Sequence, residues 1–167
     1  MSSVEHHARA PRIVRCFVIT VSDTRTEDTD TGGRAIIELL TAAGHVVEGR
    51  RLVKDEPVAV AALVAEQAAN DHVDAIITTG GTGISRRDST FEAVDALLEK
   101  RLPGFGELFR MLSYQDIGAA AMLSRACAGT HQDTVVIVLP GSENAVRLAM
   151  TRLVIPELGH LVGELRR

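Results

Sequence analysis

The chain has few of the residues on which several classes of site depend. It contains no tryptophan, one tyrosine and four phenylalanines, which disfavours a flavin site built on stacked aromatic rings. Its two cysteines, Cys16 and Cys127, lack a CxxC spacing, so we expect reduced thiols in a cytoplasmic protein. No apolar run approaches the roughly 20 residues that span a bilayer, which argues against a membrane protein. The net charge of −4 argues against a broad nucleic-acid surface.

Length and composition predict a single folded domain. A chain of 167 residues can bury about 70% of the surface that it exposes when unfolded. Residues 1–11 are polar and lack the apolar core of a signal peptide, so we expect a flexible N-terminal extension there. The His6-His7 pair within it is expected to be solvated, and the six histidines show no zinc-ligand spacing. Residues 12–167 are then one domain.

Hydrophobic patterning predicts strands and helices that alternate along the chain. Apolar, β-branched runs predict four buried strands, at residues 12–21, 45–53, 74–79 and 134–139. Apolar residues at helical spacing predict helices between and after these strands, beginning near Gly32, Pro57, Ser89, Phe105 and Ser142. This alternation implies an α/β fold with a mostly parallel sheet and helices on both of its faces.

Local signals predict where some of these elements begin and end. Ser89–Glu92 matches a capping box, in which the serine side chain caps the first turn of a helix. Leu102–Gly104 is expected to break that helix before a further short helix at residues 105–114. Residues 117–129 are compatible with a helix or with an edge strand at residues 123–126.

The ends of the predicted strands carry the polar residues that a site requires. In a parallel sheet, ligands bind outside the carboxyl ends of the strands. Polar or glycine-rich segments follow all four strands: Ser22-Asp23, Lys54–Glu56, Gly80–Gly83 and Pro140–Ser142. We therefore expect these segments to converge on one rim of the sheet.

The segment Gly80-Gly81-Thr82-Gly83 predicts a cradle for an anion. Glycine lets the backbone approach a ligand closely, and successive N–H groups in such a turn form a concave anion site. A strand-to-helix turn alone would need only one glycine. The segment is not a P-loop, because no Gly-Lys-Ser/Thr follows it, and it lacks the GxGxxG spacing of a dinucleotide fold.

Asp88 follows this cradle, where its charge would repel a bare phosphate. A divalent cation between the two removes the conflict, because Mg²⁺ is usually held by one or two carboxylates plus substrate phosphates. Asp55, at the end of a neighbouring strand, is the expected second carboxylate, and Asp23 is a third candidate. Asp28 and Asp30 are expected to favour the N-terminus of the helix that follows them. The pattern indicates nucleotide or phosphate-ester chemistry.

Other polar residues are open to two interpretations. Ser142 is either an N-cap or part of an anion site at a helix start. Arg86-Arg87 is either a solvated pair or a contact to phosphate or to a partner chain. Capping and surface ion pairing are the simplest roles for Glu107, Ser113 and Arg125. No Ser/His/Asp or Cys/His arrangement supports a covalent acyl mechanism.

The motifs, taken in order, resemble the MoaB/MogA molybdopterin-binding family, which includes the G domain of gephyrin. The resemblance covers nearly all of the chain from Arg12 to about Leu158, and the stretch Gly104–Gly118 is closer to the MoaB branch. The matching segments are Val21–Gly33, Leu52–Glu56, Thr78–Ala93, Leu102–Gly118, Met122–Gly129 and Leu139–Ser142.

This resemblance implies a three-layer α/β/α fold and an activity. The activity is adenylyl transfer from Mg-ATP to the terminal phosphate of molybdopterin, which prepares the pterin for metal insertion. The important acids of the family fall on Asp55 and Asp88, which are the implied catalytic residues and Mg²⁺ ligands. The implied contacts to pterin and phosphate are Ser22, Gly80, Gly81, Thr82, Gly83, Ser113, Gly141 and Ser142.

Other functions stay open beside this one. The main alternative is a non-catalytic protein that binds or carries molybdopterin, and a flavodoxin-like flavin binder is disfavoured for lack of aromatic residues. The resemblance also implies a homo-oligomer, with a hexamer expected and a trimer possible. The pathway served could be that of molybdenum or that of tungsten.

Overall fold

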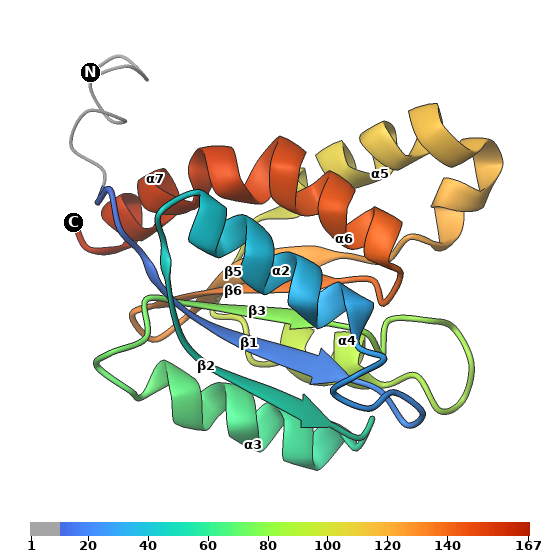
Figure 1. Ribbon diagram of the computed structural model, residues 1–167, viewed down its shortest axis with the longest axis horizontal. Coiled ribbons are helices and arrows are strands. Elements are labelled where there is room, and N and C mark those ends of the chain that lie inside the picture. Colours follow the sequence, from blue (N-terminus) through green and yellow to red (C-terminus); the bar gives the residue numbers. More distant parts are fainter. Residues whose placement is uncertain (1–10) are drawn as a thin grey trace.

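The buried runs of the sequence form the strands of one six-stranded sheet. The computed structural model describes residues 11–167, so all but Pro11 of the expected N-terminal extension, including His6-His7, lies outside the described residues. The strands are β1 (Arg15–Val21), β2 (Val46–Val53), β3 (Ala75–Thr79), β4 (Lys100–Arg101), β5 (Cys127–His131) and β6 (Thr134–Leu139). Their order across the sheet is β2-β1-β3-β6-β5-β4 (Figure 1).

The sheet is mostly parallel, as the alternation of elements predicts. Strand β1 pairs in parallel with both β2 and β3, and β3 pairs in parallel with β6. Strand β5 runs antiparallel to β6 and to the short edge strand β4. The four parallel strands therefore place their carboxyl ends along one rim.

Helices cover both faces of this sheet and complete three layers. Helices α2 (Thr31–Ala42), α5 (Pro103–Ile117), α6 (Glu143–Ala149) and α7 (Ile155–Leu165) lie over one face (Figure 1). Helices α3 (Pro57–Ala68) and α4 (Thr90–Asp95) cover the other. A 3₁₀ segment, η1 (Gly118–Leu123), follows α5, and a π-helical segment, η2 (Met150–Val154), joins α6 to α7.

The period of a β-strand explains why the core has two halves. Successive side chains of a strand point to opposite faces, so each buried strand feeds both layers. In β1, Cys16 and Val18 pack with Ile36 of α2, whereas Phe17 and Ile19 pack with Val60 of α3. Because both faces are covered, the central strands β1, β3 and β6 are buried along nearly their whole length and consist mainly of apolar residues.

Three local expectations are wrong. Ser89 does precede α4, but its hydroxyl makes no capping hydrogen bond and instead donates to Asp55. Of the two alternatives for residues 117–129, the edge strand at 123–126 is wrong, because Leu123 belongs to the helical segment η1 and the strand that follows, β5, lies inside the sheet. Helix α5 begins at Pro103 rather than Phe105, because proline suits the first turn of a helix.

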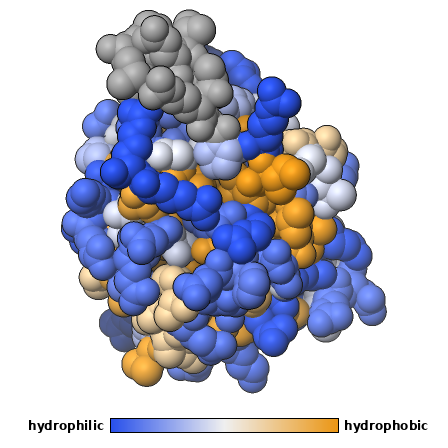
Figure 2. All heavy atoms as spheres, turned by 90° about the vertical axis from the view of Figure 1, so that its left-hand side faces the viewer, coloured by the Kyte–Doolittle hydropathy of each residue, from blue (hydrophilic) through white to orange (hydrophobic). Residues whose placement is uncertain are grey.

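The end of the molecule opposite the parallel strands' carboxyl ends has a mixed surface. Figure 2 shows this face, where hydrophilic side chains surround an area of hydrophobic ones. At this end of the sheet the buried Asp74, just before β3, accepts hydrogen bonds from Arg15 and pairs with Arg166 near the chain end. These bonds attach the last turn of the chain to the start of β1 and β3.

Asp30 ties α2 to the sheet from a fully buried position. Its carboxylate accepts from the N–H of Gly33 at 2.9 Å and from the Thr20 hydroxyl at 2.7 Å, and it pairs with Arg50 at 2.6 Å. It is therefore the N-cap of α2, in line with its expected effect at that helix start. Burial acts to raise the pKa of Asp30, but these three donors outweigh it and hold the pKa below the ordinary value of 3.8.

We expect Asp30 to make folding sensitive to acid. Because its folded-state pKa is lowered, its stabilising effect is complete above pH 3.8 and is lost as the pH falls through the lower folded value. Asp30→Asn should destabilise the protein at pH 7 by about 1–3 kcal/mol and flatten the dependence of stability on pH below about 4. Urea unfolding at several pH values measures both effects. The exposed Asp28, two residues earlier, is the matched control: Asp28→Asn should leave the curve unchanged.

Candidate functional site

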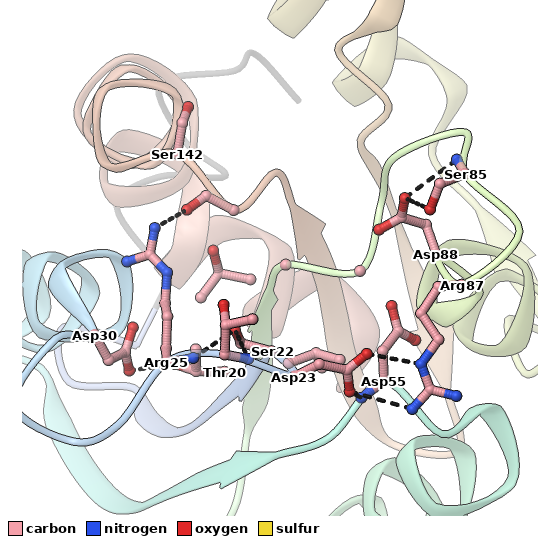
Figure 3. A pocket seen from close by; sticks show the side chains of 16 residues that line it. Thr20, Ser22, Asp23, Arg25, Asp30, Asp55, Ser85, Arg87, Asp88 and Ser142 are labelled. Carbon is pink, nitrogen blue, oxygen red and sulfur yellow. Dashed lines mark hydrogen bonds and ion pairs between the residues drawn. The ribbon is translucent and has the colours of Figure 1, made fainter.

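A cavity of about 470 Å³ opens at the carboxyl ends of β1, β2, β3 and β6. Helix α2 leaves β1 on one face of the sheet and α3 leads into β3 on the other, so the crevice lies where the connections diverge. The expected convergence of strand ends on one rim is confirmed. Figure 3 shows the side chains that point into this cavity.

Most of the predicted site residues meet at this rim. The cavity is lined by Ser22, Asp55, Gly80, Gly81, Asp88, Gly141 and Ser142. Ser113 is buried beside an adjoining cavity of about 710 Å³, which shares Ser142 with the first. Thr82 and Gly83 belong to the glycine loop, residues 80–83, but line neither cavity. The arrangement brings these residues together, and their individual roles stay predictions.

The glycine loop depends on glycine for its backbone and for close packing. Gly80 and Gly81 have φ values of +95° and +66°, in the region that side chains disfavour. A Cβ on Gly80 would meet the carbonyl oxygen of Val21, and a Cβ on Gly81 would lie 2.6 Å from Oδ2 of Asp55. The loop is therefore folded tightly against β1 and against the predicted catalytic acid.

The N–H groups of the loop are the ones available to an anion. The N–H of Gly80 already donates to the carbonyl of Leu139 at 3.1 Å. Within residues 11–167, the N–H groups of Gly81, Thr82 and Gly83 have no protein acceptor. An anion cradle at this site would thus be formed by residues 81–83, and Gly80 would serve the turn.

Asp55 is held by the start of α4. It is 4% exposed, and its Oδ1 accepts hydrogen bonds from the hydroxyls of Ser89 at 3.1 Å and Thr90 at 3.0 Å. Its backbone N–H donates to Oδ1 of Asp23 at 3.1 Å. The other carboxylate oxygen, Oδ2, lies beside Gly81 at the edge of the cavity.

Asp88 is fixed by its own loop. One carboxylate oxygen, Oδ2, accepts from the backbone N–H of Ser85 at 3.2 Å and from the Ser85 hydroxyl at 2.5 Å. A Cβ on Gly83 would lie 2.5 Å from the same oxygen, so glycine is needed for this turn. The side chain is half-buried and lines the cavity together with Asp55.

The two carboxylates fit a magnesium site that is completed by a substrate. No group of three or more potential ligands occurs in the part of the chain that the structure describes. Mg²⁺ keeps several waters and is commonly bound by one or two carboxylates with phosphate oxygens. Asp55 and Asp88 facing one cavity supply that donor set.

Asp23, the third candidate ligand, is engaged by an arginine. Arg87 donates from Nε to Oδ2 of Asp23 at 2.7 Å and from Nη2 to Oδ1 at 3.2 Å (Figure 3). These hydrogen bonds from Arg87 hold the pKa of Asp23 below its ordinary value. Arg87 is exposed, as a solvated residue would be, but it is not isolated, because the same guanidinium also pairs with Glu56 at 2.7 Å.

Arg25 is a site residue that the sequence analysis missed. Its side chain lines the cavity and donates to the carbonyl of Gly141 at 3.2 Å and to the hydroxyl of Thr31 at 3.1 Å. It thereby connects the loop after β1 with the loop after β6. An arginine between two threonines in a polar loop carries no sequence signal that separates this role from a solvated side chain.

Arg125 supports the glycine loop from outside. Its guanidinium donates to the carbonyls of Thr82 at 2.8 Å and Gly83 at 2.6 Å, pairs with Glu92, and lies 4.7 Å from the ring centroid of Phe91. The expected surface ion pair is present. The two hydrogen bonds to carbonyls add a second role, because they fix the backbone of the glycine loop beside the cavity.

We expect the loop to loosen when Arg125 is replaced. Arg125→Gln removes both charge-assisted hydrogen bonds, so amide hydrogen exchange in residues 82–88 should become about tenfold faster, as for a loss of about 1.4 kcal/mol in local stability. Exchange followed by mass spectrometry measures this. Arg101→Gln is the matched control, because Arg101 pairs with Asp95 of α4 without touching the loop. Equal protection in both variants would contradict the role of Arg125.

Neither cysteine can act as a nucleophile near neutral pH. Both are free thiols, and burial raises the pKa of Cys16 to about 12 and that of Cys127 to about 12.

Across residues 11–167, the helices are all too short or too polar to cross a membrane.

Comparison with known proteins places this site in a family. The family model described as "Probable molybdopterin binding domain" matches residues 17–160. Molybdenum cofactor biosynthesis protein B of Bacillus cereus is 53% identical over 168 residues, which cover 100% of this chain and 99% of that protein.

Two solved structures share the fold. A crystal structure of molybdenum cofactor biosynthesis protein B matches with a TM-score of 0.91 at 53% identity, over 95% of this chain and 99% of that one. The structure of MoaB from Pyrococcus furiosus, described as a tungsten cofactor synthesizing protein, matches with a TM-score of 0.84 at 38% identity. That match covers 95% of this chain and 100% of the Pyrococcus chain.

Proposed function

This chain belongs to the molybdopterin-binding domain family of molybdenum cofactor biosynthesis, and from that premise we propose that it adenylylates the terminal phosphate of molybdopterin. ATP is the adenylyl donor and Mg²⁺ is the metal. The observation that carries the proposal is the pair of carboxylates, Asp55 and Asp88, which face one cavity beside a glycine loop with unused N–H groups. The resemblance to the MoaB/MogA family, predicted from the motifs, is confirmed.

The proposed reaction needs no nucleophile from the protein. An oxygen of the terminal phosphate of molybdopterin attacks the α-phosphorus of ATP, a new P–O bond forms, and the bond to the β-phosphate breaks to release pyrophosphate. Such transfers depend on alignment and on stabilising the developing negative charge. The inert thiols and the absence of a Ser/His/Asp arrangement in the sequence agree with this chemistry.

The acids, the glycine loop and two serines have separate roles in the proposed reaction. Asp55 and Asp88 would hold Mg²⁺, which neutralises charge on the phosphates when it is bound. The N–H groups of Gly81–Gly83 would donate to phosphate oxygens, because they have no competing acceptor in the described part of the chain. Ser22 and Ser142, which also line the cavity, would add hydroxyl donors.

Two substrates require two adjoining sites. A nucleotide and a pterin are each of the size that cavities of about 300–1,000 Å³ accept. The cavities of about 470 Å³ and 710 Å³ meet at Ser142, and the buried Ser113 lines the second. We assign the first to the phosphates and the second to a ring system, so Ser113 and Ser142 both contact substrate.

The proposal includes a homo-oligomer in the cytoplasm, with a hexamer expected and a trimer possible. It is supported by large apolar side chains that α5 and η1 expose, because surfaces of this kind mark protein interfaces. They are Leu108, Met111, Tyr114, Ile117, Met122 and Leu123. Light scattering after size-exclusion chromatography measures the mass directly.

The decisive experiment tests the reaction itself. The purified protein is incubated with molybdopterin and Mg-ATP, and adenylylated molybdopterin is sought by mass spectrometry. We expect product that requires Mg²⁺ and disappears in Asp88→Ala. Tight binding of molybdopterin with no product under any divalent metal would overturn the transferase and leave a binding or carrier protein.

A further inference from the structure

Asp88 lies between two residues that are both fixed to neighbouring loops. Arg87, just before it, pairs with Asp23 after β1 and with Glu56 after β2. Ser89, just after it, donates to Oδ1 of Asp55 at 3.1 Å. The three-residue run that carries Asp88 is thus attached on both sides to the segments around Asp55.

Asp23 joins Arg87 to the backbone of Asp55. Its two carboxylate oxygens accept from Nε and Nη2 of Arg87, and its Oδ1 also accepts the backbone N–H of Asp55 at 3.1 Å. An unbroken chain of hydrogen bonds therefore runs from the residue before Asp88, through Asp23, to Asp55. Asp23 and Arg87 both line the cavity, at its edge (Figure 3).

We propose that Asp23 and Arg87 are positioning residues, which set the separation and orientation of the Asp55 and Asp88 carboxylates. The inference deepens the proposed function, since it rests on these two carboxylates acting together on a metal and a nucleotide. Neither Asp23 nor Arg87 contacts substrate in this role. They act through the backbone of Asp55 on one side and the backbone of Asp88 on the other.

The contacts favour this role over a direct phosphate contact for Arg87. Two of its three nitrogens donate to carboxylates of Asp23 and Glu56. A bidentate phosphate contact would need Nη2 as well as Nη1, so the guanidinium would have to release Glu56 or Asp23 and expose that charge to the same anion. Bidentate pairing with a carboxylate gives geometric precision, which a positioning role requires.

Two measurements test the proposal on wild type, Arg87→Gln, Asp23→Asn, the double variant and Arg87→Lys. The first is amide hydrogen exchange of Asp55 and Asp88 by NMR in the free protein, because both N–H groups have an acceptor. The second is the affinity for Mn²⁺ with α,β-methylene-ATP, followed by electron paramagnetic resonance. Arg86→Gln is the matched control, since Arg86 is an exposed neighbour.

We expect Arg87→Gln to speed exchange at Asp55, a residue that Arg87 does not touch. We also expect it to weaken Mn²⁺ binding by about 10–100-fold, as loss of partners around metal ligands does. Asp23→Asn should resemble it, the double variant should be no worse than either, and Arg87→Lys should recover part of the loss. Thermal unfolding of each variant checks that the fold is retained.

Unchanged amide exchange at Asp55 in Arg87→Gln would overturn the proposal, whether or not the affinity for the Mn²⁺-nucleotide changes. Tighter nucleotide binding in Asp23→Asn together with weaker binding in Arg87→Gln would overturn it too, because a freed arginine would then be a phosphate ligand. If wild type binds no Mn²⁺-nucleotide, the proposed transferase fails, and the exchange experiment still decides the positioning role.

Discussion

Asp88→Asn is expected to lower kcat for adenylyl transfer by about 10²–10³-fold. This is the range for losing one preorganised electrostatic group of an active site, here an acid proposed to hold Mg²⁺. The substitution keeps the shape of the side chain and removes its charge. Asp88 is half-buried, and among residues 11–167 its side chain bonds only to Ser85 of its own loop, so the fold should be retained. The rate of product formation with Mg-ATP, with the thermal unfolding midpoint beside it, measures the effect.

Asp55→Asn should produce a comparable loss for the same reason. Asparagine is the right replacement here, because its Oδ1 can still accept from Ser89 and Thr90 in a position that is 4% exposed. Alanine would leave two hydroxyls without an acceptor and confound catalysis with stability.

A distant acid provides the control for charge. Asp133→Asn changes the net charge equally, and Asp133 is exposed between β5 and β6, at the other end of the parallel strands. It should retain wild-type kcat. Full turnover in both Asp55→Asn and Asp88→Asn would refute the assignment of these residues as the acids that hold Mg²⁺.

The site could be located from the sequence because strand ends carry strong local signals. Buried strands were evident from apolar runs, and a parallel sheet must bring its carboxyl ends to one rim, so Asp55, Asp88 and the glycine loop were expected together. Their meeting follows from topology and needs no knowledge of side-chain contacts.

Side-chain partners could not be predicted, because distant residues compete for them. Ser89 and Glu92 match a capping box. The Ser89 hydroxyl instead donates to Asp55, and the Glu92 carboxylate pairs with Arg125. These partners lie 34 and 33 positions away in the sequence. For the same reason the pairing of Arg87 with Asp23, 64 positions away, left no local trace.

The antiparallel edge of the sheet was missed for a different reason. Strand β4 has only two residues, both exposed, so it has no hydrophobic pattern to detect. Strand β5 consists mainly of small and polar residues, and its first three lie in the segment 117–129, for which a helix and an edge strand at 123–126 were both open. The pairing of β5 with β6 and of β4 with β5 is decided by contacts between strands and not by local sequence.

Gly80→Ala is expected to have the largest effect on stability, a loss of about 3 kcal/mol or more. A left-handed backbone costs a residue with a side chain roughly 1–2 kcal/mol, and Gly80 has a φ of +95°. The new Cβ would also meet the carbonyl oxygen of Val21, with the carbonyl carbon at 3.2 Å. Val21 is the last residue of β1, held in the sheet, so it cannot move aside without breaking strand pairing.

Two other glycines separate the causes of this loss. Gly44→Ala shares the positive φ, at +84°, but its Cβ would meet no atom of the described residues within 4 Å, so it should cost only the backbone term of about 1–2 kcal/mol. Gly104→Ala, in the first turn of α5 with open space and no positive φ, should stabilise by about 0.5–1 kcal/mol. Urea unfolding midpoints of the three variants give the comparison. If Gly80→Ala were no less stable than Gly44→Ala, the close contact between the glycine loop and β1 would be refuted. The N–H groups of the loop would then lack the packing against β1 that is expected to hold them in position.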